Sequence, residues 1–217
     1  MNKEPFTIEE ASSTYQLATD NCGLQKGYKQ TEVGVIPEDW EVRPLDELTT
    51  TVASGRSKVT ATYGSYAVHG STGIIGFSEN VEYEGNAILV ARVGANAGKL
   101  NIVSGKYGVT DNTIILRLRS DTYLPFFWMQ LESKRLNSLV FGSGQPLITG
   151  SQLKALALSV PPLPEQTAIA NALSDVDALL AKLDQLITKK RDLKQAAVQQ
   201  LLTGQIRLLG FSSNTKY

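Results

Sequence analysis

The segment Pro161-Pro162-Leu163-Pro164-Glu165-Gln166 precedes roughly 40 residues that contain neither proline nor glycine, and this arrangement decides the fold. Proline cannot continue a helix or donate to a sheet, so these prolines end the preceding structure, and Pro164 suits the first turn of a new helix. Gly204, in Leu201-Leu202-Thr203-Gly204-Gln205-Ile206-Arg207, stands where a helix-ending residue belongs. The sequence therefore predicts one long helix, residues 165–203, within a segment 161–207.

Apolar residues repeat along this helix with the spacing of a coiled coil. The steps between them are 4, 3, 4, 3 and 4 residues, at Ile169, Leu173, Val176, Leu180, Leu183 and Ile187. At a rise of about 1.5 Å per residue the helix is about 58 Å long, which suits a spacer or a dimerisation rod. A second stripe runs beside the first, at Leu179, Leu183 and Leu186. A lone helix cannot bury these stripes, so we expect an antiparallel homodimer or pairing with another chain of the same kind.

The composition is that of a globular protein without a membrane span. The chain has 217 residues, 42% of them hydrophobic, and no apolar run approaches the ~20 residues that cross a bilayer. The start, Met1 to Pro5, lacks the apolar core of a signal peptide, and the single cysteine, Cys22, excludes a disulfide framework. These features favour the cytoplasm.

The charge is balanced overall but uneven along the chain. Lysine and arginine minus aspartate and glutamate give 3 − 7 = −4 for residues 1–40, 11 − 9 = +2 for 41–160 and 7 − 5 = +2 for 161–217. A strongly basic nucleic-acid binder would look different. A local basic face is nevertheless enough for DNA binding, so neutrality does not exclude that function.

Residues 31–160 have the pattern of one mixed α/β domain, so the predicted fold class is α+β with a long C-terminal coiled-coil helix. A polar leader, 1–30, precedes the domain with a short helix around 8–17, and a tail, 208–217, follows the helix. Apolar runs and turn signals predict strands over 39–42, 87–93, 100–103, 113–118 and 157–160. They also predict a short helix over 44–48 and a longer one over 123–140 that caps the sheet.

Signatures of enzymes are missing. The chain has one histidine, His69, so no histidine pair can bind a metal, and neither a nucleophile elbow nor a phosphate-binding Walker loop occurs. The run Phe141-Gly142-Ser143-Gly144 has the wrong spacing for a methyltransferase glycine motif and is interpreted as a loop. We therefore expect no catalytic residues and no metal site.

Three glycine-rich polar segments are candidates for DNA contact. They are the loop 54–58, the loop 66–77, which ends in an apolar pair, and the loop 92–99 after the most apolar strand. Cations, hydroxyls and amides on exposed loops suit phosphates and base edges, although solvated turns have the same composition. The candidates are Arg56, Lys58, His69, Ser71, Thr72, Arg92, Asn96 and Lys99. Asn96 either pairs with adenine or caps its own turn.

Several segments, in this order, resemble the specificity (S) subunit of type I restriction–modification systems. They are Gly34–Val42, Tyr66–Phe77, Leu89–Lys99 with Val109–Thr113, Pro161–Gln166 and Leu201–Arg207. The resemblance covers about residues 31–207. It implies a target recognition domain at 31–160 that reads one half of a bipartite DNA site, and a long helix after it. This chain has one such unit where the usual subunit has two, so it resembles a half-subunit.

The resemblance also implies the partners. They are double-stranded DNA, methyltransferase (M) subunits and, in larger assemblies, restriction (R) subunits. The S subunit of this family has no catalytic activity. S-adenosylmethionine, ATP and magnesium are expected only on partner subunits, with no cofactor on this chain.

Two other functions fit the residues. One is a methyltransferase fragment whose catalytic residues lie on another chain, and the missing cofactor motifs argue against it. The other is a protein–protein scaffold, or an inhibitor of a restriction complex, that uses the long helix without reading DNA.

Overall fold

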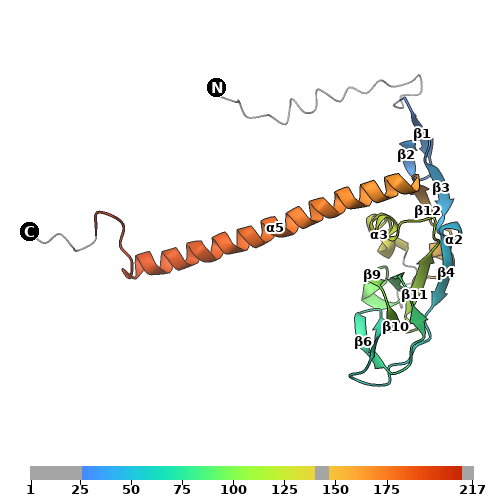
Figure 1. Cartoon of the computed structure of the whole chain (residues 1–217), viewed down its shortest axis with the longest axis horizontal. Helices are drawn as coiled ribbons and strands as arrows, with labels where there is room; N and C mark the ends of the chain where they lie inside the picture. The colour runs from blue at the N-terminus through green and yellow to red at the C-terminus, as the bar shows by residue number, and fades with distance from the viewer. Residues whose placement is uncertain (1–25, 140–146, 212–217) are drawn as a thin grey trace, which may run out of the picture. The chain divides into compact units, whose positions relative to one another are not determined.

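A computed structural model describes residues 26–139 and 147–211 (Figure 1). The predicted helix at 8–17 and the glycine run 141–144 lie outside these ranges. The chain divides into two compact units, with the boundary between Thr167 and Ala168. The α+β fold class is confirmed: β-sheets with short helices form the first unit, and the long helix α5, Leu163–Leu202, follows.

Two four-stranded sheets form the body of the first unit. One is antiparallel, in the order β4-β11-β8-β9, with strands Thr49–Ser54, Thr113–Leu118, Ala87–Ala91 and Leu100–Val103. The other has the order β6-β5-β10-β7, with strands Gly73–Ser78, Tyr66–Gly70, Lys106–Val109 and Tyr83–Glu84. Within the second sheet β5 and β10 are parallel, and the other pairs are antiparallel.

The two sheets share one apolar core. Every residue of β8 is buried, which explains the unbroken apolar run from Ala87 to Ala91. Leu89 and Ile115 of the first sheet pack with Tyr107 and Val109 of the second. Each fully buried side chain of this size stabilises the fold by roughly 1.5–3 kcal/mol relative to an exposed one. The loops that leave the strands of these two sheets are therefore attached to a rigid support.

Smaller elements complete the unit. Two antiparallel pairs are present, one of β1 and β2 (Tyr28–Thr31, Gly34–Pro37) and one of β3 and β12 (Glu41–Pro44, Ala157–Val160). The short helices are α2, α3 and α4 (Leu45–Leu48, Leu124–Ser133, Gly150–Lys154), and the 3₁₀ turns are η1 and η2 (Gly94–Asn96, Leu136–Leu139). The helix α3 packs against β8 and β9, as expected for a helix that covers the sheet (Figure 1).

Most predicted elements are confirmed, and two are corrected. The strands over 100–103, 113–118 and 157–160 have the predicted bounds. The helix predicted over 123–140 instead ends at Ser133, because Arg135 takes a left-handed backbone conformation with φ of 48°. The polar loop predicted over 66–77 is a β-hairpin, β5–β6, whose loop is only Ser71 and Thr72. Glycines at hairpin positions misled the sequence interpretation, because Gly70 pairs with Gly73 and the latter has φ of 103°.

The prolines and the Glu165-Gln166 pair have a clear role at the start of α5. The carbonyl of Pro162 accepts bonds from the backbone N–H groups of Glu165 and Gln166, at 2.9 and 3.0 Å. The Gln166 side chain is 1% exposed; its Nε2 donates to the Pro161 carbonyl and its Oε1 accepts from the Tyr123 N–H, both at 2.9 Å. The Trp40 indole donates to the Glu165 carboxylate at 3.0 Å. These bonds fix the first turn of α5 to the domain.

The remainder of α5 is one uninterrupted helix that ends where Gly204 predicts. Gly204 has φ of 74°, and Ile206 N–H bonds back to the Gln200 carbonyl at 3.1 Å. Its 40 residues correspond to about 60 Å. Within residues 26–139 and 147–211, no helix combines the length and apolar character needed to span a membrane.

Candidate nucleic-acid interface

The loop 54–58 alternates anchored and exposed residues. A Cβ on Gly55 would lie 2.1 Å from the Val109 carbonyl oxygen, so only glycine fits there. Ser57 is buried: its hydroxyl accepts from the Val109 N–H at 2.8 Å and donates to the Glu82 carboxylate at 3.0 Å. Arg56 and Lys58, between and after them, are exposed. The loop is therefore held rigidly, contrary to the flexible loop that its composition suggests.

Arg92 lies beside this loop. Its Nη1 donates to the Ser54 hydroxyl at 3.2 Å, and its Nε is buried without a partner among the described residues. The backbone of Arg92 bonds to Asn112 and Ile148. This half-buried guanidinium is bonded to Ser54, two residues before Arg56, so part of its donor capacity is already used.

A hollow next to Arg56 contains a second arginine that sequence reasoning missed. Strands β4 and β11 form its floor, and its lining includes Arg56, Glu82, Tyr83 and Arg117. The Arg117 guanidinium donates to the Glu84 carbonyl at 2.9 Å. The available signal was a single arginine inside the otherwise apolar strand 113–118.

The β5–β6 hairpin carries the next three candidates. Ser71 and Thr72 form its loop, and Thr72 is exposed. The His69 ring contacts the Tyr107 ring edge-on, with centroids 6.3 Å apart, and the His69 carbonyl accepts from the Thr110 N–H. Burial lowers the pKa of His69, so the neutral ring is favoured at neutral pH. His69 is thus a neutral, partly buried side chain, and the exposed Thr72 lies beyond it in the loop.

The loop 92–99 packs against η2, the 3₁₀ turn that follows α3. A Cβ on Gly98, which has φ of 90°, would lie 2.4 Å from the backbone nitrogen of Asn137. The main chain closes the turn, because Ala97 N–H bonds to the Gly94 carbonyl and Lys99 N–H bonds to the Asn96 carbonyl. The Asn96 amide makes no hydrogen bond with any described residue, so the side chain does not cap its own turn.

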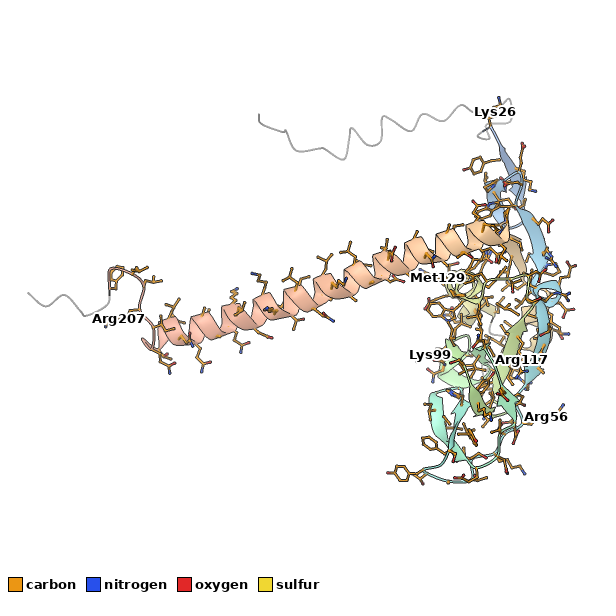
Figure 2. All side chains as sticks on the ribbon, viewed as in Figure 1. Lys26, Arg56, Lys99, Arg117, Met129 and Arg207 are labelled. Atoms are coloured by element: carbon orange, nitrogen blue, oxygen red, sulfur yellow. The ribbon has the colours of Figure 1, made fainter. Side chains whose placement is uncertain are left out.

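The structure brings the candidates together in separate groups. Arg56, Lys58 and Arg92 surround the end of β4, whereas Asn96 and Lys99 belong to a second hollow at the end of α3. Figure 2 shows Arg56 and Lys99 on opposite sides of the first unit. The two groups therefore belong to separate surfaces of the first unit.

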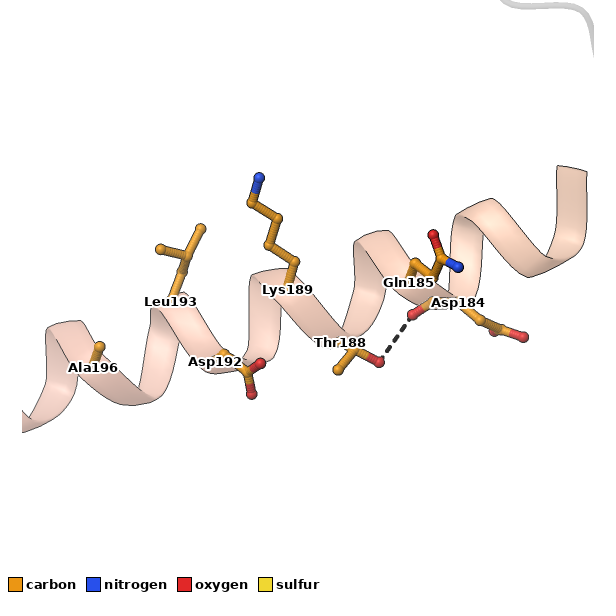
Figure 3. Close-up of a pocket in the computed structure, with 7 residues that line it drawn as sticks. All are labelled: Asp184, Gln185, Thr188, Lys189, Asp192, Leu193 and Ala196. Atoms are coloured by element: carbon orange, nitrogen blue, oxygen red, sulfur yellow. Dashed lines mark hydrogen bonds between the residues drawn. The ribbon is translucent and has the colours of Figure 1, made fainter.

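The helix α5 exposes the apolar residues that the heptad spacing selects. Ile169 is partly buried, while Leu173, Val176, Leu180, Leu183 and Ile187 are between 44 and 54% exposed. Figure 3 shows a groove on this helix between Lys189 and Leu193 on one side and Thr188 and Asp192 on the other. At 3.6 residues per turn this groove lies on the opposite side of α5 from Leu183, so it is separate from the apolar stripe.

A metal site is not found in the part of the chain that the structure describes. No group of three or more histidine, cysteine, aspartate or glutamate side chains gathers there to hold an ion.

A model of the type I restriction modification DNA specificity domain matches residues 37–190, most of this chain. The chain belongs to this family. The putative type I restriction enzyme MjaX specificity subunit of Methanocaldococcus jannaschii is 27% identical over 210 residues, 82% of this chain and 49% of the relative. The type I restriction enzyme EcoprrI specificity subunit of Escherichia coli is 26% identical over 114 residues, which cover 52% of this chain and 28% of the relative.

Solved S subunits have a similar fold. The S subunit of a type I restriction–modification system from M. genitalium matches with a TM-score of 0.57 and 25% identity, over 74% of this chain and 45% of that one. The HsdS subunit from Thermoanaerobacter tengcongensis matches with a TM-score of 0.58 and 18% identity, over 81% and 47%. The chain thus spans about half the length of the MjaX specificity subunit and of these two solved S subunits. The resemblance inferred from sequence blocks is confirmed.

Proposed function

We propose that this specificity-family chain reads one half of a bipartite DNA site through the domain 31–160 and docks methyltransferase subunits, without catalysing a reaction itself. On this proposal S-adenosylmethionine, ATP and magnesium act on the partner subunits, restriction subunits can join, and the assembly works in the cytoplasm. The observation that carries it is the family match over 37–190, which includes both the cation-bearing loops and the first part of α5.

The loop geometry supports DNA contact. Arg56, Lys58 and Lys99 form no salt bridge or side-chain hydrogen bond with any described residue, and they project from loops whose glycines lie against neighbouring backbone. A rigid support with free cations can bind phosphates and guanine edges without paying for loop ordering.

The helix supports pairing with a second copy in an antiparallel direction. Residues 163–187 hold one basic and four acidic side chains, 1 − 4 = −3, whereas residues 188–202 hold four basic and one acidic, 4 − 1 = +3. Antiparallel pairing places each acidic part against a basic part, and parallel pairing opposes like charges. The helix dipole favours charges only in the first and last turns, so it does not explain the charges in the middle of α5.

An antiparallel pair would hold two domains in opposite orientation. The DNA target of such a homodimer is an interrupted palindrome with an unread spacer of fixed length. Half-sites read from one side of DNA lie about 34–36 Å apart per helical turn, a distance that a tilted helix of about 60 Å can bridge. Inserting seven residues after Lys189 should lengthen the spacer and leave the half-site bases unchanged.

DNA recognition is tested with the complete complex of this chain and its methyltransferase. Methylome sequencing of cells that carry the system gives the target, and binding is then measured on target and scrambled duplexes. We expect Arg56→Ala and Lys99→Ala each to weaken binding. If the side chain reads a base, the loss should be about 1–3 kcal/mol, and the base preference at one position of the DNA site should be relaxed. Arg119→Ala, a surface arginine paired with Asp121, is the control. No effect of either loop variant on affinity or on its salt dependence would refute this interface.

The orientation of the helices is tested by cross-linking single cysteines in a Cys22→Ser background. With a short bismaleimide, an antiparallel dimer cross-links at Leu183→Cys and not at Leu201→Cys, because the two copies of residue 201 lie at opposite ends. A parallel dimer cross-links at both positions. Light scattering that shows only monomers at tens of micromolar, without any partner, would refute homodimerisation.

The two alternatives predict different results. A scaffold or inhibitor that uses only the helix binds target and scrambled duplexes equally in the complex. A methyltransferase fragment binds S-adenosylmethionine as an isolated chain, which calorimetry can measure.

A further inference from the structure

The helix α3 ends in an unusual backbone conformation. Arg135 has φ of 48° and is the only residue other than glycine with positive φ in the ranges 26–139 and 147–211. This is the position after a helix where glycine is common, because a side chain in the left-handed region costs free energy that glycine avoids. An arginine there calls for a reason outside the helix end.

The backbone bonds of Arg135 account for the turn, but they do not account for an arginine side chain at this position. Its N–H bonds to the Glu132 carbonyl at 3.2 Å, and its carbonyl accepts from the Ser138 N–H at 2.8 Å. A glycine would make the same two bonds. The Arg135 side chain is exposed and forms no salt bridge or hydrogen bond with any described residue.

Arg135 lines the same hollow as two of the candidates from the 92–99 loop. The polar side chains around it are Asn96, Lys99, Glu132, Arg135 and Asn137, and Leu100, Leu131 and Leu136 contribute apolar surface. Two cations and two amides face one carboxylate, so the hollow is positive. The two walls are in direct contact, because Gly98 lies against the backbone of Asn137 with no room for a Cβ.

We propose that Arg135 binds a phosphate of the DNA backbone in this hollow, together with Lys99 and Asn96. This rests on the proposed DNA-reading function. An arginine that reads a base needs its planar guanidinium held in one orientation, usually by a second hydrogen bond. A phosphate accepts charged donors from many directions. Arg135 and Lys99 have no described partner that orients them, so a phosphate suits them better than a base edge.

The test uses the full chain assembled with its methyltransferase, with affinity for the target duplex measured over a range of salt concentrations. Arg135→Gly removes the side chain and relieves the backbone. We expect an unfolding midpoint equal to or above that of the wild type, weaker DNA binding, and a salt dependence, log Kd against log salt, that is reduced by about 0.9. Arg135→Lys should restore most of the salt dependence, because a phosphate contact needs charge more than shape.

Lys134→Ala is the matched control, since Lys134 is the adjacent cation and does not line the hollow. An equal loss with Lys134→Ala would overturn the proposal in favour of long-range charge. A lower unfolding midpoint for Arg135→Gly would assign the side chain to the fold. A changed base preference at one position would overturn the phosphate assignment.

Different results would contradict the proposed function and the proposed role of Arg135. If the wild-type complex does not distinguish target from scrambled DNA, the proposed function fails. If it does, and Arg135→Gly binds with unchanged affinity and salt dependence, only the role of Arg135 fails.

Discussion

The first turn of α5 and the rest of the same helix are stabilised in opposite ways. In the first turn a polar side chain, Gln166, is buried with a bond at each end of its amide, and Glu165 accepts the Trp40 indole. From Asn171 to Leu202 every residue is exposed, including large apolar ones such as Leu183.

The difference shows which contacts this chain completes by itself. A buried amide is tolerated only when it is hydrogen-bonded, so the domain supplies every partner that Gln166 needs. Exposed leucines at coiled-coil spacing gain nothing until a second helix covers them. The helix is thus attached through polar bonds at one end and keeps its apolar surface for another chain.

The largest expected effect comes from placing a charge in the apolar stripe. Leu183→Asp would bury one carboxylate from each chain in the proposed helix pair, and an unpaired buried charge costs at least about 3 kcal/mol. We expect a monomer by sedimentation or light scattering, with the domain still folded. Gln185→Asp, on the opposite side of the helix, is the control. A dimer of unchanged affinity in Leu183→Asp would show that this stripe is not the interface.

The next largest effect concerns the buried amide. Gln166→Leu keeps the approximate size but leaves the Tyr123 N–H and the Pro161 carbonyl without partners. We expect the free energy of unfolding of the domain to fall by about 2–3 kcal/mol, measured by urea denaturation. Gln199→Leu, the same change on the exposed part of α5, should have almost no effect on the domain. Equal stability of both variants would mean that the first turn is not held by Gln166.

The indole bond should contribute less, because Trp40 and Glu165 are only partly buried. Trp40→Phe removes one hydrogen bond to a carboxylate and should lower the free energy of unfolding by about 1–2 kcal/mol. Trp128→Phe makes the same change where the indole N–H has no described partner. The two losses in free energy of unfolding are compared after correction for the difference in buried volume. Equal corrected losses would show that the bond to Glu165 does not stabilise the domain.

The smallest expected effect is a difference in pH dependence between the domain and the exposed part of α5. The chain's single histidine, His69, lies in the domain, and burial lowers its pKa. The unfolded chain therefore binds a proton more readily, so the stability that neutral His69 contributes is present above its unfolded pKa of about 6.5 and is lost as the pH falls through the folded value. Between pH 7.5 and 5.5 the domain should lose stability while helix pairing stays constant. A variant His69→Phe should lose less, and an unchanged pH dependence in that variant would contradict the prediction.

The sequence predicted features that depend on local pattern. Prolines, Gly204 and the apolar repeat predicted the helix to within two residues, and strands such as 113–118 were identified from their mainly apolar residues. Hairpin 66–78 was missed because its three glycines have loop composition, whereas its strands are defined by pairing with each other and with β10. Pairing between segments about 40 residues apart leaves no local signal.

The surface groups were harder to predict for the same reason. Asn96 and Lys99 were predicted from the sequence, whereas Arg135, which reaches the same hollow from a different element, was not. Arg56 was predicted but Arg117 was not, because an arginine within an apolar strand has no distinctive spacing. Residues that gather through tertiary packing are found only when the packing is known.

The alternation in the loop 54–58 has a consequence for how such a protein can change. Gly55 and Ser57 are locked by backbone contacts, so almost any mutation there would be eliminated by its cost to folding. Arg56 and Lys58 touch nothing that the fold needs, so mutations at these codons are nearly neutral for stability. New surface chemistry can therefore arise in single steps on an unchanged framework, and natural variation should concentrate at the two outward positions.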